Sequence, residues 1–166
     1  MAPVSAVGQG SPPGDDPGEE PVSIGVAGAP ATEGSPPRVL VLAVDLAWAS
    51  RLAAQLRSAG ADPETVHDAG ELAAHLAAGG IGAVVIDLAA RAYDGIAALG
   101  TAAATGLPVL AIGQHDDVDL RRRALAAGAS WVHSYRTMFE RGPQIFAAWL
   151  AAGRGDLLPP PMEPEP

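Results

Sequence analysis

The sequence contains no cysteine, no lysine and no asparagine. Without cysteine, the chain has no disulfide framework, no cysteine-ligated zinc site and no thiol nucleophile. All ten basic residues are arginine. Lysine and asparagine both use A-rich codons, so we interpret their joint absence as the mark of a GC-rich genome and not as a feature of the chemistry.

Long apolar segments and targeting signals are also missing. The longest aliphatic run covers residues 39–44, which is far shorter than the ~20 residues that a membrane-spanning helix needs. The N-terminus lacks the basic segment and the apolar segment that make up a signal peptide. We therefore expect a cytoplasmic protein with no membrane partner.

Positive charge is scarce, because ten arginines face 19 acidic residues and the net charge is −9. Residues 1–37 contain five acidic residues and no basic one, whereas residues 38–150 contain nine arginines and eleven acidic residues. Nucleic-acid-binding domains gain most of their nonspecific affinity by neutralising phosphates, and anionic membrane surfaces attract basic segments. This charge balance argues against nucleic acid and membrane as partners.

Proline and glycine are concentrated at the two ends of the chain. Residues 1–37 contain eight prolines and seven glycines, and residues 159–166 contain five prolines, which leaves three prolines in between. Such segments bury too little apolar surface to offset their ordering entropy. The composition predicts a disordered acidic arm over residues 1–37, one domain over residues 38–152 and a disordered proline-rich tail over residues 153–166.

The central part of the chain alternates short apolar strands with helices. Continuous aliphatic runs such as residues 39–44 and 83–86 are typical of strands buried on both faces. Strands are predicted over residues 39–44, 63–66, 83–86, 108–112 and 130–134, and helices over 48–59, 69–78, 96–104, 121–127 and 143–150. This alternation predicts an α/β fold with a doubly wound, five-stranded parallel sheet of the flavodoxin-like type.

Several helix ends are marked by local sequence signals. Asp68 followed by Glu71 has the spacing of a capping box. Asp116 or Asp117 is placed to cap the helix over residues 121–127. Pro143 suits the first turn of the closing helix.

In sheets of this kind, functional residues lie beyond the carboxyl ends of the strands. The side chains at those ends follow four of the five predicted strands: Asp45, Asp87, Gly113 to His115, and Ser134 to Arg136.

The region over residues 38–150 resembles the receiver domain of bacterial response regulators, of the chemotaxis type. The resemblance rests on residues 84–88 followed by Asp94 and Gly95, with support from residues 107–112 and 126–130. In that family the aspartate at the end of the third strand accepts a phosphoryl group, and an Asp-Gly pair follows seven and eight residues later. The resemblance therefore implies that Asp87 is the equivalent of the phosphoacceptor.

The same resemblance exposes departures at the positions that support phosphorylation. Receivers usually end their first strand with two adjacent acidic residues, whereas this chain has Asp45 alone. The hydroxyl residue after the fourth strand is replaced by Gly113. The lysine after the fifth strand is replaced by Tyr135, and the switch aromatic of that strand aligns with Val132.

Phosphoryl transfer to a carboxylate depends on positioning and on cancelling the charge of the equatorial oxygens. The resemblance implies Mg²⁺ bound by the acidic residues, and here Asp45, Asp87 and the Ala89 carbonyl offer a poorer set of ligands for that ion. No other cofactor is indicated. We therefore expect phosphorylation of Asp87 to be weak or absent.

We expect an atypical, single-domain, receiver-like signalling or adaptor protein that acts through protein contacts and is not an enzyme. One alternative is a phosphorylatable single-domain response regulator that uses Asp87 and a histidine kinase partner. Another is a small α/β ligand-binding protein or enzyme that shares only the fold. The sequence does not indicate an oligomeric state.

A basic cluster is the candidate surface for a protein partner. Arg121, Arg122 and Arg123 are consecutive, and we expect them to lie near Trp131 and Tyr135, since arginine and aromatic residues are enriched at binding hot spots. The plainer interpretation of the triplet is a solvated helix face.

Overall fold

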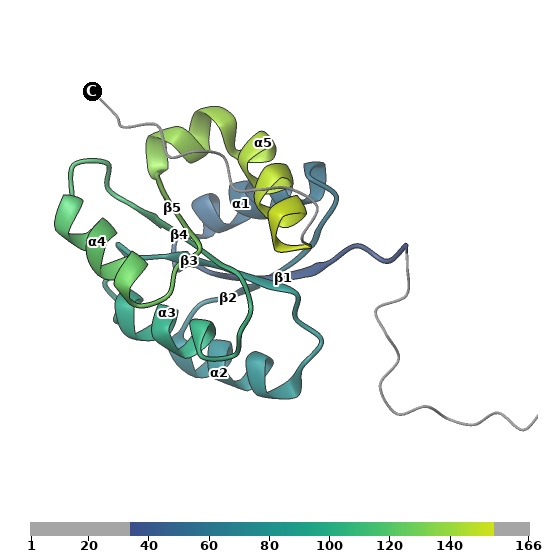
Figure 1. The fold of residues 1–166 in the computed structure, drawn as a ribbon, viewed down its shortest axis with the longest axis horizontal. Helices are drawn as coiled ribbons and strands as arrows, with labels where there is room; N and C mark the ends of the chain where they lie inside the picture. Colours follow the sequence, from purple (N-terminus) through teal and green to yellow (C-terminus); the bar gives the residue numbers. More distant parts are fainter. Residues whose placement is uncertain (1–33, 155–166) are drawn as a thin grey trace, which may run out of the picture. The chain divides into compact units, whose positions relative to one another are not determined.

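Five short parallel strands form one sheet in the order β2-β1-β3-β4-β5 (Figure 1). The structure is a computed structural model, and it describes residues 34–154. The elements in chain order are β1 (Arg38–Leu42), α1 (Leu46–Ser58), β2 (Asp62–Val66), α2 (Ala69–Ala78), β3 (Ala83–Asp87), α3 (Gly95–Ala103), β4 (Val109–Gly113), α4 (Val118–Ala126), β5 (Trp131–Ser134) and α5 (Tyr135–Gly153).

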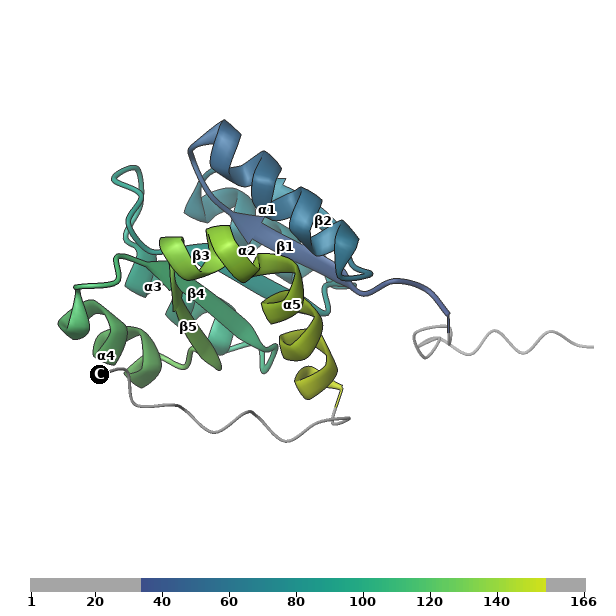
Figure 2. The same cartoon turned by 90° about the horizontal axis from the view of Figure 1, so that it is seen from above.

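Helices cover both faces of the sheet, with α1 and α5 on one face and α2, α3 and α4 on the other (Figures 1 and 2). Successive side chains of a strand point to opposite faces. Val39 and Val41 of β1 accordingly pack in the core beneath α1 and α5, whereas Leu40 and Leu42 pack in the core beneath α2, α3 and α4. All four side chains are fully buried. The doubly wound α/β fold predicted from the sequence is confirmed.

The predicted arm over residues 1–37 and tail over residues 153–166 fall largely outside the described residues. At the N-terminal boundary, the ordered contacts begin one residue before the predicted start of the domain at residue 38. The backbone N–H of Asp62 donates to the carbonyl of Pro37 at 2.9 Å. Among residues 34–154, no helix is long and apolar enough to span a membrane.

Each of the five described helices begins after an aspartate or a serine whose side chain accepts a backbone hydrogen bond in the first turn. These N-cap residues are Asp45, Asp68, Asp94, Asp117 and Ser134. The predicted cap at Asp68 is confirmed, and Asp117 is the cap of α4. The capping box differs in one detail, because the Glu71 carboxylate accepts from the N–H of His67 at 2.8 Å and not from that of Asp68.

The closing helix begins eight residues earlier than the sequence predicts. Ser134 caps α5 directly after β5, and the helix then bends at Arg141, whose φ of −133° is not helical. Figure 2 shows the two segments of α5 running in different directions. Pro143 lies in the first turn of the second segment. The proline therefore indicates where the helix resumes after the bend, and not where α5 begins.

Beside the bend, two carbonyls of α5 accept hydrogen bonds from side chains of α1. Pro143 has no N–H to donate to the carbonyl of Phe139 four residues earlier. A guanidinium N–H of Arg51 lies 3.4 Å from that oxygen. The side-chain amide of Gln55 donates to the carbonyl of Met138 at 2.9 Å.

Candidate functional site

Asp87 is the last residue of β3, a central strand, and its carboxylate is nearly enclosed. The residue is 6% exposed. Its Oδ1 accepts a hydrogen bond from the backbone N–H of Ala89 at 3.0 Å, so the carboxylate also orders the loop that follows the strand. Asp87 therefore lies at the carboxyl end of its strand, as predicted.

Tyr135 brings the fifth strand into contact with Asp87. It is the first residue of α5, and its hydroxyl donates a hydrogen bond to Oδ1 of Asp87. The ring of Trp48 packs edge-on against the Tyr135 ring, with the centroids 5.3 Å apart, and so restricts its position. Tyr135, which the sequence resemblance aligns with the lysine of receivers, thus supplies a hydroxyl donor to the carboxylate.

The hydroxyl of a second tyrosine, Tyr93, contacts the main chain at the same strand end. The hydroxyl of Tyr93 lies 2.7 Å from the main-chain carbonyl of Asp87 and 3.1 Å from that of Leu42, so it ties the end of β3 to the end of β1. Tyr93 was not among the site residues predicted from the sequence. The available signal was that Tyr93 is one of only two tyrosines in the chain and directly precedes Asp94, the cap of α3.

Burial dominates the electrostatics of this cluster. Desolvation raises the pKa of Asp87 above its ordinary value, while the hydrogen bonds from Tyr135 and from the Ala89 N–H lower it and the charge of Asp45 adds a further rise. Burial also raises the pKa of Tyr135 and of Tyr93, and the negative charge of Asp87 adds to both shifts. Both phenols are therefore neutral hydrogen-bond donors at physiological pH.

The residues present do not fit a magnesium site. Asp45 is exposed and its carboxylate caps α1, accepting from the N–H of Trp48 at 2.8 Å. Oδ1 of Asp87 already accepts two hydrogen bonds. Mg²⁺ binds carboxylate oxygens in near-ideal octahedral geometry, and no group of three acidic, histidine or cysteine side chains within residues 34–154 is placed to hold a metal ion. The Asp45, Asp87 and Ala89 ligand set stays a prediction that the geometry disfavours.

Gly113 and Val132, the other two predicted equivalents of switch positions, lie in apolar surroundings. Gly113, at the end of β4, has no side chain and so offers no hydroxyl. A Cβ atom at this position would lie 3.4 Å from the side chain of Leu120 and 3.8 Å from that of Leu88, so its surroundings are apolar. Val132 of β5 is buried in the core beneath α2, α3 and α4. Its carbonyl accepts a hydrogen bond from Arg121 at 3.2 Å, which ties α4 to β5.

The arginine triplet and the two aromatic residues do not form one surface. Trp131 and Tyr135 pack against the core beneath α1 and α5, on the opposite side of the sheet from α4. The alternation of side chains along β5 causes this separation, since Trp131 points away from the face that Val132 occupies. Of the triplet, Arg121 reaches β5, and Arg122 forms an ion pair with Asp119 on its own helix.

No protein-family model matches the sequence, and no curated protein matches it. Among solved structures, NtrX from Brucella abortus in complex with ADP superposes with a TM-score of 0.65 at 20% identity, over 72% of this chain and 28% of that one. The chain thus corresponds to well under a third of NtrX. The receiver domain of the Francisella response regulator 1452 gives a TM-score of 0.61 at 19% identity, over 70% of this chain and 98% of the domain.

A third match extends the likeness to another isolated receiver domain. The signal receiver domain of a putative Luxo repressor protein from Vibrio parahaemolyticus gives a TM-score of 0.64 at 17% identity, over 73% of this chain and 95% of that one. Two of these three matches cover nearly the whole of a separate receiver domain. The described part of the chain therefore has the fold of the response regulator receiver domains.

Proposed function

We propose that the chain is a receiver-like signalling module that acts through protein contacts and in which Tyr135 keeps Asp87 from accepting a phosphoryl group. The observation that carries the proposal is the hydrogen bond from the Tyr135 hydroxyl to the buried Asp87 carboxylate. On this proposal the module is not an enzyme, works in the cytoplasm and has another signalling protein as its partner.

The chemistry of aspartyl phosphorylation supports this proposal. Attack on a phosphodonor requires an accessible carboxylate oxygen and positive charge around the transferring group. Asp87 is 6% exposed, and within residues 34–154 its carboxylate is held by the Tyr135 hydroxyl and the Ala89 N–H. A neutral phenol does not cancel charge as a lysine ammonium does. The apolar surroundings of Gly113 remove a further polar contact.

Incubation with acetyl phosphate and Mg²⁺, followed by intact-mass measurement, tests the proposal on the full chain. We expect the wild-type protein to gain little or no phosphoryl mass. Asp87→Ala gives the background of the measurement. Stoichiometric addition of one phosphoryl group to the wild type, abolished by Asp87→Ala, would overturn the proposal in favour of a phosphorylatable response regulator.

A second variant tests whether Tyr135 itself is responsible. Tyr135→Lys removes the phenol and places a cation beside Asp87, so we expect its labelling to rise above that of the wild type. The rise should disappear when Asp87→Ala is added. Labelling of Tyr135→Lys no higher than that of the wild type would contradict the role given to the Tyr135 hydroxyl.

A further inference from the structure

Charge is divided unequally between the two sides of the sheet. The helices α1 and α5, together with the residues that cap them, carry five exposed arginines and two acidic residues, Asp45 and Glu140. The arginines are Arg51, Arg57, Arg136, Arg141 and Arg154. The other described residues carry five arginines and nine acidic residues. One face of an acidic protein is therefore basic.

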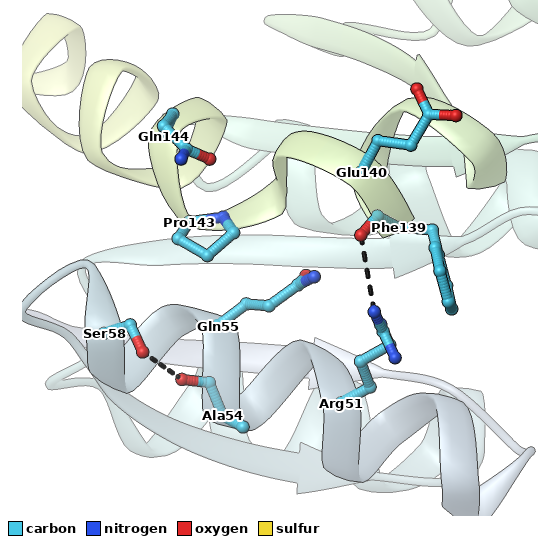
Figure 3. Close-up of a pocket in the computed structure, with 8 residues that line it drawn as sticks. All are labelled: Arg51, Ala54, Gln55, Ser58, Phe139, Glu140, Pro143 and Gln144. Carbon is cyan, nitrogen blue, oxygen red and sulfur yellow. Dashed lines mark hydrogen bonds between the residues drawn. The ribbon is translucent and has the colours of Figure 1, made fainter.

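A groove runs between the two basic helices beside the bend in α5 (Figure 3). Its volume is ≈ 450 Å³, and Phe139 and Pro143 of α5 and Arg51 and Gln55 of α1 are among the residues that line it. Phe139 is 58% exposed, so much of its side chain is accessible to a ligand. The Arg51 guanidinium lies 3.6 Å from the centroid of the Phe139 ring, so a cation and an aromatic face stand together in the groove.

The chain after Arg154 has the chemistry that such a groove binds. Residues 155–166 contain three acidic residues, no basic residue and five prolines. Proline-rich segments lose little entropy on binding and dock on grooves with exposed aromatic side chains. Their carboxylates complement a basic surface. Leu157, Leu158 and Met162 add apolar surface to the same segment.

The segment is also long enough to reach the groove. Phe139 precedes Arg154 by 15 residues, and at 1.5 Å per residue a helix of that length spans at most about 22 Å. Twelve residues in the polyproline II conformation span roughly 37 Å at 3.1 Å per residue. A segment that starts at the end of α5 can therefore turn back along the helix and pass Phe139.

We infer that the groove between α1 and α5 is a docking site for residues 155–166 of the same chain, with Phe139 contacting the prolines and the arginines of the two helices contacting the acidic side chains. This inference is independent of the state of Asp87. It assigns an intramolecular ligand to the surface formed by α1 and α5.

The absence of cysteine makes a direct test possible, because Met162→Cys provides a unique attachment point for a nitroxide spin label in the full chain. Paramagnetic broadening of amide signals then reports which residues lie near position 162. We expect strong broadening at Arg51, Ala54 and Phe139, which line the groove, and weak broadening at Leu72 and Ala98 on the opposite face. Broadening that is absent, or equal on the two faces, would overturn the inference.

Matched variants separate docking from general proximity. Replacing the acidic residues of the segment, Asp156→Asn with Glu163→Gln and Glu165→Gln, leaves residues 34–154 untouched and should reduce the broadening in the groove. Arg51→Glu with Phe139→Ala should reduce it as well, whereas Arg91→Glu, an exposed charge reversal outside α1 and α5, should leave it unchanged. Equal loss with Arg91→Glu would contradict a specific site.

A mixing experiment distinguishes this chain's own segment from that of a second copy. Isotope-labelled protein without the spin label is mixed with unlabelled protein that carries it. We expect no selective broadening in the mixture. Groove signals that broaden in the mixture as strongly as in the single chain would show an intermolecular contact and overturn the intramolecular assignment.

Discussion

The side-chain amide of Gln55 donates a hydrogen bond to the main-chain carbonyl of Met138, 2.9 Å away across the α1/α5 interface. The two residues are 83 positions apart in the sequence. This buried bond provides a partner for a main-chain carbonyl close to the bend at Arg141. It also requires space, because the Gln55 amide lies where a side chain on Gly142 would be.

The close approach predicts that Gly142→Ala destabilises the protein. The added methyl group would overlap the Gln55 amide, and relieving the overlap would displace the amide from the Met138 carbonyl. Overpacking of this kind costs about 1–3 kcal/mol of unfolding free energy. Urea unfolding followed by circular dichroism measures the loss.

The control is the same substitution in a Gln55→Ala background. There the overlap is gone, so Gly142→Ala should cost much less than in the wild type, and the double-mutant cycle should give a coupling free energy of about 0.5–3 kcal/mol. Equal costs in the two backgrounds would show that Gly142 is needed for another reason.

The fold was predictable because its signals are local. Continuous aliphatic runs such as residues 83–86 identified the buried strands, and Asp68 identified a helix start. The beginning of α5 was not predictable, because the bend at Arg141 depends on donors from Arg51 and Gln55 in a distant helix. A proline such as Pro143 gives the same sequence signal in the first turn of a helix as in the first turn after a bend, so the sequence does not distinguish the two cases.

The candidate site was predictable only in outline. Parallel strands end at the same edge of the sheet, which placed Asp87 and Tyr135 near each other. The hydrogen bond between them, and the support from Tyr93, depend on how far a side chain reaches across that edge. The predicted grouping of Trp131 with the α4 arginines failed because a single-residue step along β5 reverses the face.

Asp87 should make the stability of the protein depend on pH. Burial raises its pKa in the folded state, so the fold favours the protonated carboxyl. The stability that this group contributes is complete below the pKa of the unfolded chain and is lost as the pH rises through the folded pKa. Asp87→Asn cannot ionise, and we expect it to be more stable than the wild type at pH 7.

Chemical unfolding at several pH values measures this difference. The advantage of Asp87→Asn should shrink as the pH falls through the raised pKa of the folded state towards 3.8, the ordinary value for the group, and should not change further below that value. The same replacement at the exposed Asp62 is the control for removing one surface charge. An advantage that does not change with pH would show that ionisation of Asp87 is not its cause.

Two glycines of α3 should respond to alanine in opposite directions. A methyl group on Gly95 would lie 2.8 Å from the Cα and the carbonyl oxygen of Leu88, which are backbone atoms that cannot move aside cheaply. Gly100 has nothing within 4 Å of the same position. We expect Gly95→Ala to lose about 1–3 kcal/mol and Gly100→Ala to gain about 0.5–1 kcal/mol from helix propensity. Thermal melts that shift in the same direction for both would contradict this interpretation.

The arginine triplet of α4 should contribute unequally to stability, because its members have different contacts. Arg121 donates to the carbonyl of Val132 and joins α4 to β5, so Arg121→Ala should cost about 0.5–1.5 kcal/mol. Arg122 pairs with Asp119 on the surface, and Arg122→Ala should cost at most about 0.5 kcal/mol. No hydrogen bond or ion pair joins the side chain of Arg123 to another described residue, and Arg123→Ala should be neutral.

This ranking decides how the triplet is tested as a binding surface. Arg122→Glu with Arg123→Glu reverses two charges without removing the bond from Arg121 to Val132, so a loss of partner capture in this variant reports on binding. Arg121→Glu with Arg122→Glu also removes that bond, and its melting temperature should fall. Equal melting temperatures for the two variants would contradict the structural role of Arg121, and undiminished capture by both would leave the triplet as a solvated helix face.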